Sequence, residues 1–146
     1  MELLKNHIFL NKDFKSKEEY FDFIGKFLYE EGYVVKDYSN KLVEREKEYP
    51  TGLPMNIGVA IPHTDSKYVN SDTITITTLS ENILFGEMGG EENDTVDVRI
   101  CINLVLSDGN KHLEILQEII QKIQKDNFLE KVLEASTEEE VLEIFK

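Results

Sequence analysis

Residues 95–106 read TVDVRICINLVL, a run that is almost continuously apolar after Arg99. Such runs, rich in β-branched residues, are typical of a strand that is buried on both faces of a sheet. We therefore expect this segment to be the central strand of the molecule. Cys101 lies within it, and its thiol is expected to be packed in the core because cysteine is among the most buried residue types.

The other strands are predicted on the N-terminal side of this segment. Thr73–Leu79 alternates in polarity and is β-branched, Ile83–Phe85 is a short extended piece, and Asn56–Ile61 is a third candidate. Residues 87–94 form a polar turn that contains glycine, and Tyr49–Pro54, with its two prolines, is predicted to be a loop.

Helices are predicted on both sides of the strands. Ser16–Glu19 and Thr137–Glu140 are capping boxes that open the first and last helices, and Gly32 closes the first. A shorter helix is expected over 37–46, and two more over about 111–123 and 126–134. The third helix is expected to bury one apolar face, made of Leu113, Leu116, Ile119, Ile120 and Ile123. The chain is therefore predicted to be one compact α/β domain over 1–146, with helices flanking a mixed sheet.

Composition excludes several classes of function. The net charge of −13 makes nucleic acid and anionic membranes poor partners, because both present phosphates that basic residues must neutralise. The chain lacks a signal peptide and any apolar run long enough for membrane insertion, so a cytoplasmic protein is expected. A single cysteine excludes an internal disulfide framework.

His63 is the first candidate for chemistry. It ends the run Gly58-Val59-Ala60-Ile61-Pro62-His63, in which Pro62 fixes its own φ and holds Ile61 extended. The imidazole should therefore be held in one place at the end of a strand. A neutral imidazole is a nucleophile and a base near pH 7, which suits phosphoryl or proton transfer. A histidine that only hydrogen-bonds its neighbours is the alternative.

Two further residues could assist His63. His112 begins a helix, where the unpaired N–H groups attract anions and favour a neutral ring, so it could donate a hydrogen bond to a phosphoryl oxygen. A solvated first-turn histidine is the alternative. Arg45 carries a planar guanidinium suited to phosphate, unless it pairs with Glu46 or another carboxylate. His7, near the terminus, is expected to be non-catalytic.

Other chemistries lack their signatures. The chain contains no glycine-rich nucleotide loop, no CxxC and no HExxH motif, so neither a metal nor a cofactor is expected.

Three blocks of this sequence together resemble the enzyme IIA components of the phosphoenolpyruvate-dependent sugar phosphotransferase system, in the fructose–mannitol class. The blocks are Arg45-Glu46 with Tyr49–Leu53, then Gly58–Asp65, and then Lys111–Leu116. They occur in the family's order and span most of the chain. The Tyr-Pro-Thr-Gly-Leu version is most similar to galactitol-type members.

The resemblance implies a phosphotransferase with a phosphohistidine intermediate and a mixed sheet flanked by helices. His63 would accept a phosphoryl group from the phosphocarrier HPr and pass it to a cysteine of a IIB partner. Arg45 and His112 would support the group, and Thr51 is a further candidate for phosphoryl binding. A regulatory module of the nitrogen-regulatory type, controlling a protein partner through the same histidine, is the alternative function.

Overall fold

The computed structural model describes residues 2–146, which form a five-stranded sheet in the order β1-β4-β5-β3-β2. The central position of the predicted strand at 95–106 is confirmed, since β5 is third of the five. Parallel pairs (β1 with β4, β3 with β5) and antiparallel pairs (β4 with β5, β2 with β3) both occur, so the mixed sheet is confirmed. The strands are β1 (Ile8–Lys12), β2 (Gly52–Leu53), β3 (Gly58–Ala60), β4 (Thr73–Gly86) and β5 (Thr95–Val105).

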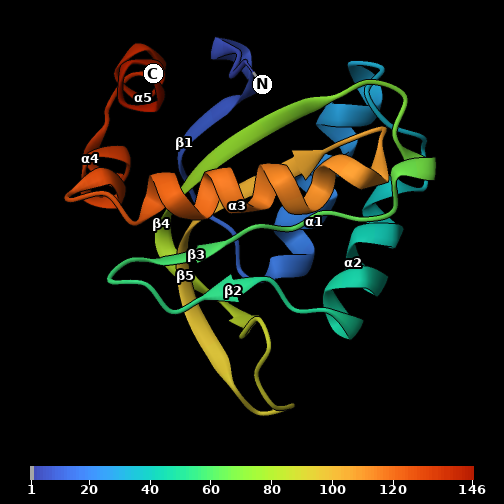
Figure 1. Cartoon of the computed structure of the whole chain (residues 1–146), viewed down its shortest axis with the longest axis horizontal. Coiled ribbons are helices and arrows are strands. Elements are labelled where there is room, and N and C mark those ends of the chain that lie inside the picture. Colours follow the sequence, from blue (N-terminus) through green and yellow to red (C-terminus); the bar gives the residue numbers. More distant parts are fainter. Residues whose placement is uncertain (1) are drawn as a thin grey trace.

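Helices cover both faces of this sheet (Figure 1). One apolar cluster joins the first two helices to one face, and a second joins the last three helices to the other. The fold is therefore a three-layer α/β domain. Its helices are α1 (Lys17–Glu30), α2 (Tyr38–Glu48), α3 (His112–Ile123), α4 (Phe128–Glu134) and α5 (Glu138–Phe145), with short 3-10 segments η1 (Lys5–His7), η2 (Ser66–Tyr68) and η3 (Gly109–Lys111).

The predicted helix ends are confirmed by their hydrogen bonds. The Ser16 side chain accepts from Glu19 N–H at the start of α1, and the Thr137 side chain accepts from Glu140 N–H at the start of α5. Gly32 follows α1 with φ +86°, a conformation that glycine adopts without steric cost. These local interactions are encoded within a few residues, which explains why the sequence pattern finds them.

A bulge at Arg99 decides which side chains of β5 face which layer. Val98 and Ile100 pair with consecutive residues of β3, so Arg99 is the extra residue, and it donates from Nε to the Leu79 carbonyl at 2.7 Å. Val98 therefore packs in the cluster with α1, whereas Ile100 packs in the cluster with α3. The two predicted pieces, Thr73–Leu79 and Ile83–Phe85, belong to one strand, β4, whose register with β5 shifts between Thr78 and Ile83.

Three predictions need correction. Ile8–Lys12 forms strand β1, which the sequence analysis did not find, because five residues with a left-handed Asn11 (φ 55°) carry a weak pattern. Gly52–Leu53 forms strand β2 within the predicted loop. Leu113 is not on the buried face of α3, since 65% of its surface is exposed.

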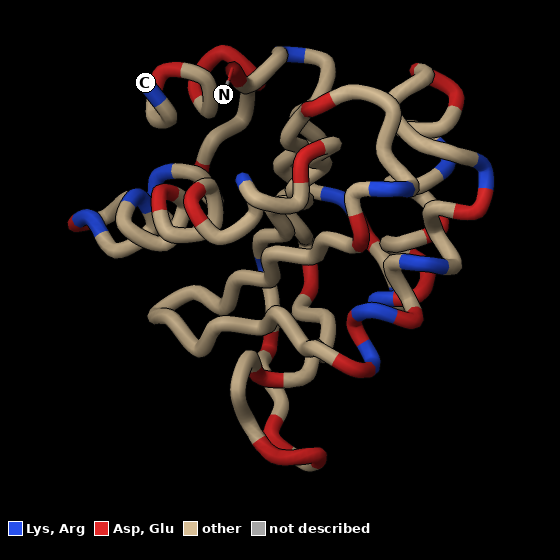
Figure 2. Tube along the Cα trace, turned by 45° about the vertical axis from the view of Figure 1, so that its right-hand side comes forward, with Lys and Arg blue, Asp and Glu red and all other residues tan. Residues whose placement is uncertain are grey.

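Acidic residues gather on the hairpin that joins β4 to β5 (Figure 2). Its tip, residues 87–94, is polar and turns back on itself, as predicted. In residues 2–146 no helix combines the length and the apolar character that crossing a membrane requires.

Candidate functional site

His63, Arg45 and His112 line one cleft of about 460 Å³. The remaining wall residues are Thr64, Asp65, Ser66, Gly109 and Leu113. Three residues that are distant in the sequence are thus brought together, in line with the expectation that Arg45 and His112 could assist His63.

The topology of the sheet explains this convergence. β3 and β5 are parallel neighbours, so their carboxyl ends meet at one edge. His63 follows β3, and His112 opens α3 after the short connection from β5. Because β2 runs antiparallel to β3, the chain leaving α2 also arrives at this edge, with Gly52 opposite Ala60. Arg45, in the last turn of α2, is carried there with it.

Buried hydrogen bonds fix the peptide that precedes His63. The Pro62 carbonyl accepts from the Leu104 N–H at 3.1 Å and from Nδ2 of Asn103 at 2.9 Å. Asn103 is fully buried in β5 and also contacts the Tyr38 hydroxyl at 3.2 Å. Sequence reasoning missed this role of Asn103, although an amide inside an apolar strand was a signal for it.

The same local geometry fixes the tautomer of His63. Its Nδ1 lies 3.0 Å from the carbonyl oxygen of Ile61, which can only accept, so Nδ1 carries the proton. The neutral ring therefore has its lone pair on Nε2. Burial lowers the pKa of His63 below its ordinary value of 6.5, and His112 and Arg45 lower it further, against the opposing effect of the Ile61 carbonyl. The result is a neutral imidazole whose nucleophilic atom is Nε2.

His112 faces His63 across the cleft. The two ring centroids are 5.2 Å apart, with 35° between the ring planes. Burial and the Arg45 charge lower the pKa of His112, against the opposing charges of Asp65, Asp72 and Asp108. Its Nε2 is buried, and within residues 2–146 it has no hydrogen-bond partner. In the tautomer that carries its proton on Nε2, a neutral His112 can donate from this nitrogen to a group bound beside His63.

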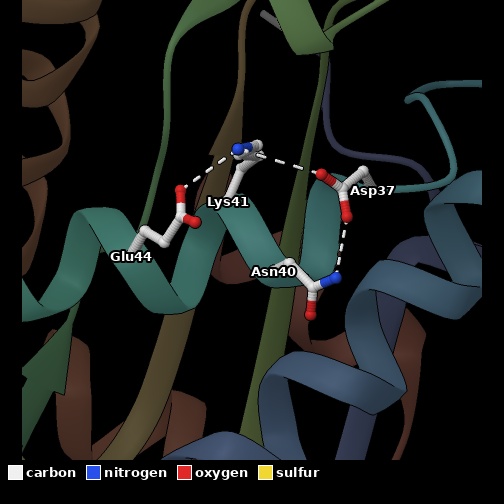
Figure 3. Close-up of polar contacts among 4 residues, drawn as sticks. All are labelled: Asp37, Asn40, Lys41 and Glu44. Carbon is white, nitrogen blue, oxygen red and sulfur yellow. Dashed lines mark hydrogen bonds and ion pairs between the residues drawn. The ribbon is translucent and has the colours of Figure 1, made fainter.

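Arg45, in the last turn of α2, keeps its guanidinium unpaired, in contrast to Lys41 in the first turn of the same helix. Lys41 lies 3.9 Å from Asp37 and 3.2 Å from Glu44, an arrangement that Figure 3 shows together with Asn40. Among the described residues, no ion pair includes Arg45. Its Cζ instead lies 4.2 Å from the centroid of the Tyr49 ring. The ion-pair interpretation of Arg45 is therefore not what the structure shows, and its charge is free to meet an anion in the cleft.

Thr51 does not lie among the residues that line the cleft. It is buried, and its N–H and hydroxyl donate to the two carboxylate oxygens of Glu46 at 2.7 and 2.9 Å. Thr51 had been predicted as a candidate for phosphoryl binding, but the structure does not bring it into the cleft. Burial raises the pKa of Glu46 to about 7, and the two hydrogen bonds from Thr51 oppose that rise.

The remaining chemistry-bearing residues lie away from the cleft. His7 is buried, contacts the Thr73 hydroxyl at 2.7 Å and packs edge-on against Phe27 and Tyr33. Cys101 is fully buried, as predicted, and burial raises the pKa of its thiol. Across residues 2–146, no cluster of His, Cys, Asp and Glu side chains is suited to hold a metal ion.

Fold and site together define an α/β protein with a neutral, oriented histidine in a cleft that also holds a second histidine and a free arginine. Comparison with known proteins agrees with that class. The family described as "Phosphoenolpyruvate-dependent sugar phosphotransferase system, EIIA 2" matches residues 2–146. The chain belongs to this family, and it is a phosphotransferase component of the sugar phosphotransferase system.

Individual relatives support the same assignment. The chain is 33% identical to the mannitol-specific phosphotransferase enzyme IIA component of Bacillus subtilis, over 98% of this chain and 95% of that protein. The crystal structure of IIA mannitol from Escherichia coli superposes with a TM-score of 0.82 at 26% identity, covering all of both chains. In the mannitol-specific EIICBA component of Escherichia coli, which is 29% identical over 94% of this chain, the match spans 21% of a longer polypeptide.

The protonation of the two cleft histidines can be measured directly. Because the pKa of each ring is lowered, we expect His63 and His112 to titrate below pH 6.5. The measurement is the pH dependence of their ring-proton NMR shifts. In the unfolded chain both bind a proton near pH 6.5, so stability should fall as the pH drops from 6.5 toward the folded pKa values. A midpoint above 6.5 for His63 would contradict the proposed neutral nucleophile.

Proposed function

We propose that this protein accepts a phosphoryl group from phospho-HPr on Nε2 of His63 and passes it to a cysteine of a IIB component. The observation that carries the proposal is the orientation of His63, whose Nδ1 is held by the Ile61 carbonyl in a cleft shared with Arg45 and His112. Membership of the IIA family supports the same reaction.

The two transfer steps are displacements at phosphorus. In the first, the lone pair of His63 Nε2 forms a bond to phosphorus as the bond between phosphorus and the HPr imidazole breaks. In the second, a IIB thiolate forms the new bond and His63 Nε2 leaves with its electron pair. Such transfers need in-line positioning and donors for the phosphoryl oxygens more than covalent help. Arg45 and the unpartnered Nε2 of His112 would supply those donors.

Exposed apolar side chains around the cleft suit a protein partner. Leu113 lines the cleft and is 65% exposed, and Tyr49 is 53% exposed beside Arg45. A contact centred on apolar groups lets water leave while the two reacting centres approach. The exposure of Leu113 thus fits a docking surface for HPr and IIB. A solved complex of enzyme IIAMTL and phosphorylated enzyme IIBMTL from Escherichia coli, 27% identical with a TM-score of 0.81, supports a IIB partner.

We place the reaction in the cytoplasm, where phosphoenolpyruvate is made and where a free thiol such as Cys101 stays reduced. A transport role is favoured over the regulatory alternative, because the relatives that match at 32–33% identity over nearly the full chain are named as mannitol-specific IIA components.

The polyol class can be tested with the acceptor protein. The full-length relatives are mannitol-specific, whereas the Tyr49–Leu53 block had suggested a galactitol-type protein. We propose the mannitol class and expect the phosphorylated protein to label a mannitol-type IIB faster than a galactitol-type IIB, as measured by quench-flow. A faster transfer to the galactitol-type acceptor would restore the galactitol assignment.

Phosphorylation of His63 is tested by substitution. With phosphoenolpyruvate, enzyme I and HPr, the wild-type protein should gain one phosphoryl group that is lost in acid and kept in base. His63→Gln should gain none, because the amide offers no nucleophilic nitrogen, while His7→Gln should still be labelled. Intact mass spectrometry measures both, and undiminished labelling of His63→Gln would contradict the assignment of His63 as the phosphorylated residue.

Arg45 should accelerate transfer through its charge. Arg45→Ala is expected to slow labelling by phospho-HPr by about 100-fold or more, since one charge-assisted donor to a transferring group is worth roughly 10²–10³ in rate. Lys47→Ala, an exposed cation on the same helix, is the matched control and should change the rate little. Equal effects of the two substitutions would show that only the overall charge matters.

A further inference from the structure

We propose that Glu46 is a positioning residue for His63, acting through Thr51 rather than on the phosphoryl group itself. The inference rests on the proposed function for its kinetic consequence, but the geometry that it concerns exists in the unphosphorylated protein. Arg45 and Glu46 are adjacent in the last turns of α2, and their side chains have different surroundings. Arg45 lines the cleft, whereas Glu46 is only 3% exposed.

A buried carboxylate without a cation is costly, because desolvation opposes the charge. Within residues 2–146, Glu46 makes no ion pair. Both of its oxygens are instead used by Thr51, with Oε2 accepting from the N–H at 2.7 Å and Oε1 from the hydroxyl at 2.9 Å. This cost indicates that the position of Thr51 matters to the protein.

A continuous series of hydrogen bonds leads from Thr51 to His63. The Thr51 carbonyl accepts from the Ile61 N–H at 3.3 Å, and the Ile61 carbonyl lies 3.0 Å from Nδ1 of His63. The carboxylate therefore fixes the residue that holds Ile61, and Ile61 fixes the tautomer of the nucleophile. The same series ties the end of α2, and with it Arg45, to the strand that presents His63.

The ionised form of Glu46 suits this role because a carboxylate only accepts hydrogen bonds and can meet both Thr51 donors at once. Because the pKa of Glu46 is about 7, the measurements below are made well above pH 7, where this form dominates. Glutamine has nearly the same shape but places an NH2 group against one of these donors. Glu46→Gln therefore changes the hydrogen bonding with little change in volume. Thr51→Val removes the hydroxyl donor and keeps the N–H, whereas Thr51→Ser keeps both.

The first measurement is the ring nitrogen NMR of His63 in the unphosphorylated protein. In the wild type, the Nδ1 and Nε2 resonances should be widely separated, because one tautomer dominates. In Glu46→Gln they should move toward each other as the tautomers mix. Thr51→Val should show a smaller movement, and both Thr51→Ser and Glu48→Gln, an exposed residue of the same helix, should match the wild type.

The second measurement is the rate of labelling by phospho-HPr. We expect Glu46→Gln to lose about 10- to 100-fold, since misplacement of a reacting group by about 1 Å can cost 10²-fold, with Thr51→Ser retaining the wild-type rate. Should Glu46→Gln fail to fold by circular dichroism, Thr51→Val decides the question. If a folded Glu46→Gln or Thr51→Val protein kept the wild-type separation between the Nδ1 and Nε2 resonances of His63, the proposal would be overturned, even if the rate fell. A wild-type protein that takes up no phosphate would instead refute the proposed function, while the nitrogen shifts would still test the positioning role.

Discussion

The parallel pairing of β3 with β5 is the constraint on which the site depends. It sets the carboxyl ends of the two strands side by side, and each strand delivers one histidine to that edge. The bulge at Arg99 interrupts this pairing and turns Ile100, Ile102 and Leu104 toward α3. The cluster that these residues form holds α3 against the sheet, with its first residue, His112, in the cleft. Packing of the core and placement of the site are therefore consequences of the same strand pair.

The cleft combines one unpaired positive charge, on Arg45, with two histidine rings that stay neutral. The chain carries a net charge of −13, yet the cleft contains an unpaired guanidinium and two rings whose pKa values are lowered. The protein keeps its imidazoles neutral through burial and a nearby positive charge, so the lone pair of His63 is available near pH 7. An incoming dianion would meet these groups without first displacing a carboxylate from Arg45.

Much of this could be predicted from the sequence, and the parts that failed did so for identifiable physical reasons. Caps at Ser16 and Thr137 and the central strand follow from short-range pattern. Strand β1 was missed because its own pattern is weak and its pairing partner, β4, is distant in the sequence. Strand β2 was missed because two residues, Gly52 and Leu53, are too few to show an alternating pattern. For the site, Pro62 marked His63, but no spacing rule links Thr51 to Glu46. Leu113 follows the helical periodicity of α3 yet is exposed. Periodicity shows which residues share one side of a helix, but it does not show how far the sheet covers that side.

The two ends of the described chain lie near α5, whereas α3 begins away from them, on the side of the domain toward α2 (Figure 1). The cleft is lined by His112, the first residue of α3. Leu3 and Leu142 share one apolar cluster, and Lys5 pairs with Glu139. A neighbouring domain joined through either end would be tethered on the side of α5. A domain of this fold can therefore form part of a longer polypeptide, as in the EIICBA relative, while the cleft stays away from the junctions.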